Sequence, residues 1–521
     1  MSGLGKGIIS SSTAKLIQLS GIRVSCVKID PYVNYDAGTM NPIAHGEVYV
    51  TDDGGECDMD IGNYERFLNI SIKKEHNITT GRIYSQVIKA ERSGKYLGQC
   101  VQIIPHITDA IKNSLRKIAE DENLQVLVIE CGGTVGDIES LPFLEAFRQM
   151  ELEEGVNNTL FIHVTLAPIL DVVGEQKTKP TQHSIQELRR IGIQPDILAV
   201  RCKIKLSNET KKKISLFASI AENCVISSHD ADSIYSIPEL LASQGLMNTI
   251  TKKLDLPKRQ IKYQNWKSIA KSFTTQNKNI RIAIVGKYVT LPDSYVSIYH
   301  ALSHAGAKNG IQVHIEWIES EKFEDKDNLD YLDNFDGILI PGGFGKRGTS
   351  GMINVANYSR LKNIPYLGIC LGFQLALVSF ARNVCKITEA NSTELDQKTK
   401  NPIIEFMPEQ RSINDLGGTM RLGSHEIEIK PGTIASKIYL SRTINRRHRH
   451  RYEFNKKYLD IIERNGMILS GFSDYGKRTE ILEIPRHKFY VAIQYHAEFS
   501  SRPGKPEQSF EEFVKTASLK F

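Results

Sequence analysis

The sequence lacks the features that mark several classes of protein. No apolar run approaches the roughly 18 residues that a membrane-spanning helix needs, and no basic stretch followed by an apolar one stands at its start. Its 8 cysteines include no Cys-x-x-Cys pair, which argues against a zinc ribbon or a thioredoxin-like motif and favours free thiols in a reducing compartment. We therefore expect a cytoplasmic protein without a membrane span or signal peptide.

An excess of one charge is also lacking. Lys and Arg number 66 against 60 Asp and Glu, and a net charge of +6 over 521 residues is too small to indicate nucleic acid or an anionic membrane as a partner. The hydrophobic share of 40% and the charged share of 24% are ordinary for a soluble globular protein. At about 100–200 residues per domain, this length predicts two to four domains.

What the sequence does contain is a regular alternation of strand-like and helical segments. The spacing of apolar residues over 141–152 predicts a helix. Apolar runs that predict strands in the first half occupy residues 24–30, 125–130, 160–164 and 197–200. Such alternation indicates a mostly parallel sheet with helices on both faces.

A second alternation follows a polar stretch rich in Lys, Gln, Asn and Thr. Runs that predict strands begin it at 280–286, 337–343 and 365–370. The fold class is therefore α/β, with two doubly wound domains. The expected organisation is a first domain over 1–254, a linker with one helix over 255–279, and a second domain over 280–521.

The second domain contains a Gly-x-Cys-x-Gly sequence, Gly368 to Gly372, directly after a predicted strand. Glycines at these places allow a sharp turn from strand to helix, which exposes the nucleophile and directs the next backbone N–H at a developing oxyanion. Pro341 to Gly345 could supply a second such N–H. The other interpretation is a buried structural cysteine in a tight turn.

A base for this cysteine is suggested near the end of the chain. His496 and Glu498 follow the apolar run 490–495 with one residue between them. On an extended segment, that spacing puts the imidazole and the carboxylate on the same side, as a base and its orienting group require. Taken alone, His-x-Glu is a weak signal.

Together these residues resemble the class I glutamine amidotransferases, whose triad is Cys, His and Glu in this chain order. The resemblance implies Cys370 as nucleophile, His496 as base and Glu498 as the group that orients the base. Ala497 stands where the family usually has Pro, which leaves the backbone freer there. Such domains hydrolyse glutamine and pass ammonia to a synthetase, so we expect the first half to be a synthetase.

The start of the chain is typical of a phosphate-binding loop that runs into a helix. Ser2 to Gly7 are rich in glycine and contain Lys6, and backbone N–H groups at a helix N-terminus bind phosphate. The loop is not a full Walker A sequence, because Gly7 follows Lys6 and no upstream glycine is present. The alternative is a short Gly/Ser tail.

Acidic and basic residues elsewhere in the first half suit a magnesium–nucleotide site. Asp60 and Glu130 offer the hard oxygen ligands that Mg²⁺ prefers, and Glu130 ends a predicted strand, where open α/β sheets bind ligands. Lys177 to Gln182 form a basic stretch suited to an anionic substrate. The alternatives are solvated carboxylates and a surface loop.

Longer blocks of sequence resemble the CTP synthases over nearly the entire chain. These blocks occupy residues 28–32, 45–48, 62–67, 80–85, 132–140 and 447–452. The resemblance implies a glutamine-hydrolysing ligase of pyrimidine biosynthesis that uses ATP to phosphorylate the 4-oxygen of UTP and lets ammonia displace the phosphate. It also implies Mg²⁺, GTP as activator, CTP as feedback inhibitor, and a homotetramer that can form filaments, with no nucleic acid or membrane partner.

The same resemblance assigns the remaining site residues by their match to the family's motifs. The ATP and UTP phosphates are assigned to Ser2, Gly3, Leu4, Gly5, Lys6, Gly7, Ile8, Lys28 and Asp60, and the metal to Asp60 and Glu130. The site for UTP and CTP is assigned to Asp137, Ile138, Glu139, Lys177, Thr178, Lys179, Pro180, Thr181, Gln182 and Lys213. The glutamine pocket is assigned to Gly343, Leu371, Gly372, Phe373, Gln374, Glu394 and Arg451. Residues 417–423 match the GTP lid, and His45 and Val48 match the mouth of the ammonia tunnel.

One departure from the family concerns the start of the chain. The family has a β-strand and a Thr-Gly-Gly turn before the phosphate loop, and here Met1 stands in their place. Loss of a central strand would unpair its neighbours. Either this start is artificial, or ATP binding is lost and the chain is a silent subunit that assembles with full-length copies. A third hypothesis is an amidotransferase–synthetase with another acceptor, which the block 132–140 and residues 177–182 argue against.

Overall fold

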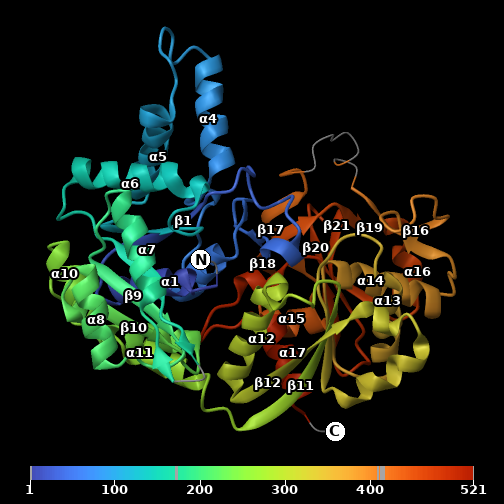
Figure 1. The fold of residues 1–521 in the computed structure, drawn as a ribbon. Helices are drawn as coiled ribbons and strands as arrows, with labels where there is room; N and C mark the ends of the chain where they lie inside the picture. Colours follow the sequence, from blue (N-terminus) through green and yellow to red (C-terminus); the bar gives the residue numbers. More distant parts are fainter. Residues whose placement is uncertain (1–2, 171–173, 408–409, 411–416, 520–521) are drawn as a thin grey trace. The chain divides into compact units, whose positions relative to one another are not determined.

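The computed structural model describes residues 3–170, 174–407, 410 and 417–519, which form two compact units (Figure 1). The first unit comprises Met1–Asp36 and Asn63–Lys271, and the second comprises Ala37–Gly62 and Ser272–Phe521. The segment 37–62 thus belongs to the second unit although it comes from the first half of the chain. Among the described residues, no helix is long and apolar enough to cross a membrane.

The first unit contains two separate three-stranded parallel sheets. Their strand orders are β4-β1-β5 and β10-β9-β6. The bounds of these strands are β1 (Val24–Asp30), β4 (Asn77–Thr79), β5 (Val126–Cys131), β6 (Ile162–Leu166), β9 (Ile197–Cys202) and β10 (Val225–His229). All four strands predicted in the first half are confirmed, and β6 begins two residues later than predicted.

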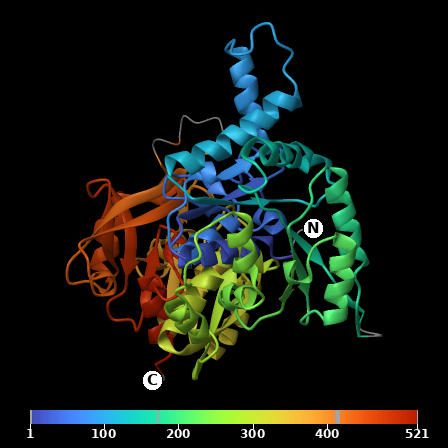
Figure 2. The ribbon, with the colours of Figure 1, turned by 90° about the vertical axis from the view of Figure 1, so that its left-hand side faces the viewer.

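Helices cover these sheets and bury their apolar faces against them. The helices are α1 (Lys6–Leu19), α3 (Asp60–Leu68), α4 (Thr80–Arg92), α5 (Thr108–Asp121), α6 (Leu141–Glu154), α7 (Lys179–Arg190), α8 (Asn208–Ala218), α9 (Ile237–Ala242), α10 (Leu246–Lys253) and α11 (Gln264–Ser272). One core lies between β1, α4, α5 and α6 and includes Ile29, Ile83 and Ile111. Helix α4 and the chain that joins it to α5 project from the rest of this unit (Figure 2).

A cavity of about 750 Å³ lies between the two sheets of the first unit, and both β5 and β6 line it. Each of these strands is the last of its own sheet among the described residues. The walls include apolar side chains such as Val128, Ile162 and Val164, and Leu4 lies at the end that leads into α1. The cavity therefore presents two strand edges and an apolar lining to any extended segment ahead of α1.

We predict that about ten strand-forming, apolar residues added ahead of Met1 will fill this cavity and stabilise the first unit. Pairing with β5 and β6 and burial of several aliphatic side chains should raise the free energy of unfolding by on the order of 5 kcal/mol. Urea unfolding measures the change. A Gly/Ser extension of equal length is the control, and equal stability of the two extended chains would contradict the prediction.

The second unit is built on a nine-stranded sheet in the order β12-β11-β13-β14-β22-β21-β20-β17-β18. The first five strands are parallel and the remaining pairs are antiparallel. The bounds are β11 (Lys278–Gly286), β12 (Ile311–Glu319), β13 (Gly337–Ile340), β14 (Tyr366–Ile369), β17 (Arg421–Ile429), β18 (Thr443–His450), β20 (Ile468–Ser473), β21 (Arg478–Glu483) and β22 (Tyr490–Ile493). The strands predicted at 280–286 and 365–370 are confirmed, and the strand predicted at 337–343 is confirmed as far as Ile340.

Two apolar cores lie on the opposite faces of this sheet. One core contains side chains of α13 (Thr349–Lys362) and α14 (Leu371–Asn383), and the other contains those of α12 (Val296–Asn309), α15 (Ile434–Tyr439) and α17 (Gln508–Ala517). A small sheet of β15 (Ala390–Ser392), β16 (Asn401–Phe406) and β19 (Tyr452–Phe454) packs beside α14. Helices on both faces of a sheet are the layering expected from the sequence.

The segment 37–62 is held in the second unit by charged contacts. It contains α2 (Pro42–His45), β2 (Tyr49–Val50) and β3 (Glu56–Cys57). Glu47 accepts a hydrogen bond from the backbone N–H of Ser297 at 3.2 Å. Two arginines of β18 pair with the same segment: Arg447 Nε is 2.6 Å from Asp52 Oδ1, and Arg449 Nε is 2.8 Å from Glu56 Oε1.

Candidate active site

Cys370 lies at the sharp turn between β14 and α14 that the sequence predicts. Its φ of 52° and ψ of −99° are unusual for a residue other than glycine, and strain of this kind is concentrated at functional sites. A Cβ on Gly372 would lie 2.2 Å from the carbonyl oxygen of Ile340, and one on Gly368 would lie 2.8 Å from the carbonyl of Gly372. The turn therefore requires glycine at both places.

His496 and Glu498 meet as predicted, but on a different backbone. The Nδ1 of His496 is 2.7 Å from Oε1 of Glu498. Strand β22 ends at Ile493, and His496 caps a 3-10 turn over Ala497–Ser500. The extended segment expected from the sequence is thus wrong, because the strand's apolar run does not determine where pairing with β14 and β21 stops. The turn still brings the two side chains into contact.

The charge state of His496 is set by its two neighbours. Burial lowers the pKa of this imidazole, but the charges of Glu498 and Cys370 and hydrogen bonds to both raise it further, to about 10. His496 is therefore an imidazolium at neutral pH, beside the sulfur of Cys370. Such a pair provides a nucleophilic thiolate and a proton donor for a leaving amine.

We predict that glutamine hydrolysis will persist into alkaline solution and decline as the pH rises past about 10, where His496 loses its proton. Because this pKa exceeds the ordinary 6.5, protonated His496 also stabilises the fold, fully below pH 6.5 and less as the pH approaches 10. Replacing Glu498 by Gln should move the alkaline limb down by at least about one pH unit. The measurement is the pH profile of glutamate release, with Glu426→Gln on the exposed side of β17 as control. An unmoved limb would contradict the assignment.

The glycine-rich segment after β13, Pro341 to Gly345, is held by hydrogen bonds to two charged side chains. Glu394 Oε1 accepts the backbone N–H of Gly345 at 2.7 Å, and Lys287 Nζ donates to the carbonyl of Phe344 at 3.1 Å. Burial lowers the pKa of Lys287 to about 8. Burial also raises the pKa of Glu394, against the hydrogen bond from Gly345 and the charge of Lys287. The sequence analysis missed Lys287, although it directly follows a predicted strand in the same domain.

The other predicted glutamine-pocket residues lie around the same turn. Leu371 to Gln374 form the first turn of α14, and Gln374 Nε2 donates to the carbonyl of Tyr452 at 3.1 Å. Arg451 Nη1 donates to Gln410 at 2.7 Å. A Cβ on Gly343 would lie 3.5 Å from Leu371, so these two residues are neighbours. The Phe373 side chain is fully buried in the core, so only its backbone is available to a ligand.

In the first unit, basic and acidic residues gather at the carboxyl ends of β1 and β5. Gly5, with φ of 78°, precedes α1, and Lys6 Nζ is 3.4 Å from the carbonyl of Gly133. Lys28 Nζ is 3.6 Å from Glu130 Oε1, and Tyr64 donates its hydroxyl to the other oxygen of Glu130. Gly3, Leu4, Gly7 and Ile8 lie in the same loop and helix start, whereas Ser2 is outside the described residues.

Asp60 is the first residue of α3, and its backbone N–H donates to Asp58 Oδ1 at 2.8 Å. Asp60 belongs to the second compact unit and Glu130 to the first. Asp137 accepts the backbone N–H of Thr134 at 2.9 Å, and the following Ile138 and Glu139 are exposed.

The basic stretch 177–182 leads into a helix, and its last four residues are helical. Helix α7 begins at Lys179, with Pro180 in its first turn, where proline is tolerated, and Thr181 donates to the carbonyl of Leu166 at 2.9 Å. Lys177 Nζ is 2.5 Å from Glu175 Oε2. The hydrogen bond and charge of Lys177, together with the charge of Lys213 on α8, lower the pKa of Glu175. The remaining members, Thr178 and Gln182, are buried and hydrogen-bonded to each other.

Comparison with known proteins relates both halves of the chain to known families. Residues 1–256 match the family profile of the CTP synthase N-terminus, and residues 290–516 match that of glutamine amidotransferase class-I. Proteins named CTP synthase from Thermococcus gammatolerans, Thermococcus kodakarensis and Archaeoglobus fulgidus are each 51% identical to this chain. The alignments cover 99%, 100% and 100% of this chain, and 97% of each relative.

The fold and the site define a two-domain α/β ligase, with a synthetase domain joined to a class I glutamine amidotransferase domain. With half of its residues identical over the full length of several relatives, the chain belongs to the CTP synthase family. The fold class and the family predicted from the sequence are confirmed.

Proposed function

We propose that this chain converts UTP to CTP, with ATP as the phosphoryl donor and ammonia from glutamine as the nitrogen source. The observation that carries the proposal is the His496–Glu498 contact of 2.7 Å beside Cys370, in a chain whose other half groups Lys6, Lys28 and Glu130 at one sheet edge. The full-length relatives named CTP synthase support the same function.

In the glutaminase half, the thiolate of Cys370 attacks the amide carbon of glutamine. The backbone N–H of Leu371, at the start of α14, and an N–H of the glycine-rich segment near Gly343 stabilise the oxyanion. His496 donates its proton to the leaving ammonia, which leaves a thioester on Cys370. His496 then removes a proton from water, whose attack releases glutamate and regenerates the thiolate.

In the synthetase half, ATP transfers a phosphoryl group to the 4-oxygen of UTP, and ammonia then displaces it as phosphate. An oxo group is a poor leaving group, and phosphorylation makes it a good one. Lys6 and Lys28 bear positive charge where the nucleotide phosphates would lie. Asp60 and Glu130 each offer carboxylate oxygens, the ligands that Mg²⁺ prefers, and a bound Mg²⁺ would offset the charge of the phosphates.

Regulation and assembly follow the family's pattern in this proposal. GTP activates through 417–423, where the N–H of Gly418 lies 3.3 Å from Glu56, and CTP inhibits at the UTP site. His45 and Val48 lie on the segment 37–62 and form the entrance for ammonia. A homotetramer, able to form filaments in the cytoplasm, is supported by exposed apolar side chains on the projecting α4 region: Ile88, Leu97, Ile103 and Ile104 are 58%, 86%, 50% and 51% exposed.

The test is CTP formation by the 521-residue chain from UTP, ATP and Mg²⁺, first with ammonia and then with glutamine. Ammonia bypasses Cys370, so the first step reports on the synthetase half alone. CTP with both nitrogen sources is the expected result. Folded protein that forms none would contradict the proposal and favour a silent subunit, and amination of another acceptor in place of UTP would favour a different synthetase.

A further inference from the structure

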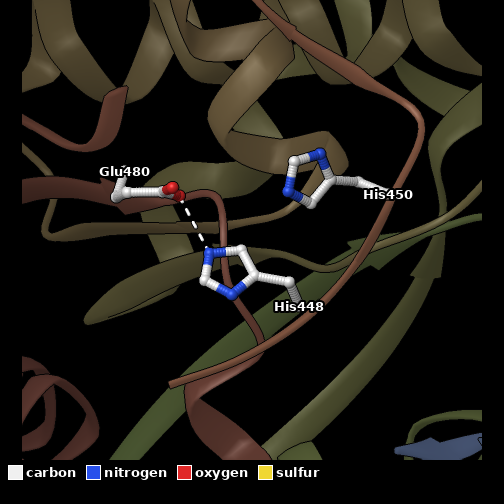
Figure 3. Close-up of side chains that lie close together, drawn as sticks. All are labelled: His448, His450 and Glu480. Carbon is white, nitrogen blue, oxygen red and sulfur yellow. Dashed lines mark hydrogen bonds and ion pairs between the residues drawn. The ribbon is translucent and has the colours of Figure 1, made fainter. Parts of the chain in front are cut away.

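The run Arg447 to Arg451 places its side chains alternately on two faces of β18. Arg447 and Arg449 point to the segment 37–62. His448 and His450 point the other way, into the interior, where they approach Glu480 of β21 (Figure 3). Exposure of these three side chains is 0%, 2% and 0%, so the cluster is shielded from solvent.

Hydrogen bonds to backbone carbonyls set the tautomer of both histidines. His448 Nδ1 is 3.0 Å from the carbonyl oxygen of Arg446, and His450 Nδ1 is 2.9 Å from that of Tyr452. A carbonyl oxygen only accepts, so each Nδ1 carries a proton and each neutral ring presents a lone pair at Nε2. This is how metal-binding histidines are commonly held, with the second ring N–H donated to a backbone carbonyl.

The two Nε2 atoms differ in their surroundings. His450 Nε2 is buried and has no hydrogen-bond donor among the described residues. His448 Nε2 lies 3.0 Å from Glu480 Oε2, which is also an acceptor. Because two bare acceptors at this distance repel, either a proton or a metal ion lies between them. Figure 3 shows one ring nitrogen of His448 facing the carboxylate of Glu480, with the ring of His450 beside this pair.

We propose that His448 Nε2, His450 Nε2 and Glu480 bind a first-row transition metal ion such as Zn²⁺. The three ligand atoms lie within 4.8 Å of one another. Two imidazoles and one carboxylate form a common zinc ligand set, and imidazole disfavours Mg²⁺, so this site is distinct in chemistry from the magnesium site of the synthetase half. A tetrahedrally coordinated ion holds its ligand atoms about 3.3 Å apart. Side-chain rotations that move the ligand atoms by roughly 1 Å would therefore complete the site.

One oxygen of Glu480 is already paired with an arginine. Arg421 Nη1 lies 2.6 Å from Glu480 Oε1, which leaves Oε2, the oxygen that faces His448 Nε2, for the metal. The positive charge of Arg421 reduces affinity for a cation, so the site should bind one less tightly than a site with two carboxylates.

A metal here would fix the strand that supports the glutaminase residues. The carbonyl of Arg447 accepts the backbone N–H of His496 at 2.8 Å, and that of Arg449 is 3.7 Å from Cys370 Sγ. A metal ion that joins side chains of β18 and β21 would therefore fix the two β18 carbonyls that contact His496 and Cys370. The role is structural, since no ligand of the proposed metal touches the reacting atoms.

The test measures zinc in the full chain, purified without a histidine tag and dialysed against buffer with a trace of Zn²⁺. About one ion per chain is expected, with X-ray absorption showing two imidazole nitrogens and one carboxylate oxygen at about 2.0–2.2 Å. Cobalt substitution should give a tetrahedral visible spectrum. His450→Gln should weaken binding at least about 100-fold, because even loss of a supporting partner costs about 10–100-fold.

His425→Gln is the matched control, since this ring packs against His448 at 5.2 Å between centroids but directs its Nε2 to the carbonyl of Leu422. It should retain the metal. Three results would overturn the proposal: wild-type protein without zinc, zinc bound through sulfur, or zinc bound equally well by His450→Gln. In that case a proton on His448 forms the bridge to Glu480. The absorption spectrum of the wild-type chain decides the question even if the variant does not fold.

Discussion

Replacing Cys370 by alanine is expected to abolish CTP formation from glutamine and to leave CTP formation from ammonia unchanged. In the proposed reaction, the sulfur of Cys370 forms the thioester. Without it, His496 has no nucleophile to activate. Removal of a catalytic nucleophile should lower glutamine-dependent turnover by at least about 1,000-fold. Ammonia-dependent turnover should stay within about twofold, because the residues proposed for nucleotide binding lie on other strands and helices.

The measurement is CTP formation at saturating UTP and ATP with each nitrogen source, for wild type and variant in parallel. Cys385→Ala is the matched control, because Cys385 is a partly exposed thiol just beyond α14 with its sulfur 3.7 Å from the carbonyl of Ile461. It should behave as wild type. Retention of glutamine-dependent synthesis by Cys370→Ala would show that another group attacks glutamine.

The sequence predicts local features of this fold well. Strands β13 and β14 are short continuous apolar runs, as is typical of buried parallel strands, so their positions follow largely from local composition. The turn at Cys370 was likewise predictable, because the glycines on either side leave few other conformations. In both cases the decisive interactions lie within a few residues of each other.

Features that depend on distant contacts were not predictable. The segment 37–62 looks like any other part of the first half, and contacts with residues far along the chain, such as its ion pairs with Arg447 and Arg449, place it in the second unit. Lys287 becomes informative only when β13 brings the glycine-rich segment beside it. The His448–Glu480 contact joins two strands that are not neighbours in the sheet, so no local pattern reveals it.

These cases also explain why one proposed site could be predicted from the sequence better than the other. The glutaminase triad needs one turn and one sheet pairing, β14 with β22, to bring Cys370 and His496 together. The residues proposed for nucleotide binding come from a loop, strands and helices that are far apart in the sequence. The chemistry of this site was suggested by residue types, and its arrangement required the structure.

Replacing Glu130 by glutamine is expected to have the opposite effect to loss of Cys370. CTP formation should fall by at least about 100-fold with either nitrogen source, while glutamine hydrolysis continues. The Gln side chain at position 130 preserves the size of Glu130 and can still accept a hydrogen bond from the Tyr64 hydroxyl. It removes the negative charge that faces Lys28, which is the partner of residue 130 in the pairing of β1 with β5. Loss of a carboxylate ligand also weakens Mg²⁺ binding, so the magnesium concentration for half-maximal synthesis should rise.

The measurement is CTP formation over a magnesium titration, with glutamate release followed in the same samples. Glu120→Gln, exposed on α5 in the same unit, removes one negative charge without touching the proposed site and should match wild type. If Glu130→Gln retains synthesis with an unchanged magnesium dependence, Glu130 is a structural partner of Lys28 and not a metal ligand. If glutamine hydrolysis is lost as well, the substitution has disturbed the whole fold, and the melting temperature relative to Glu120→Gln distinguishes that outcome from a local effect.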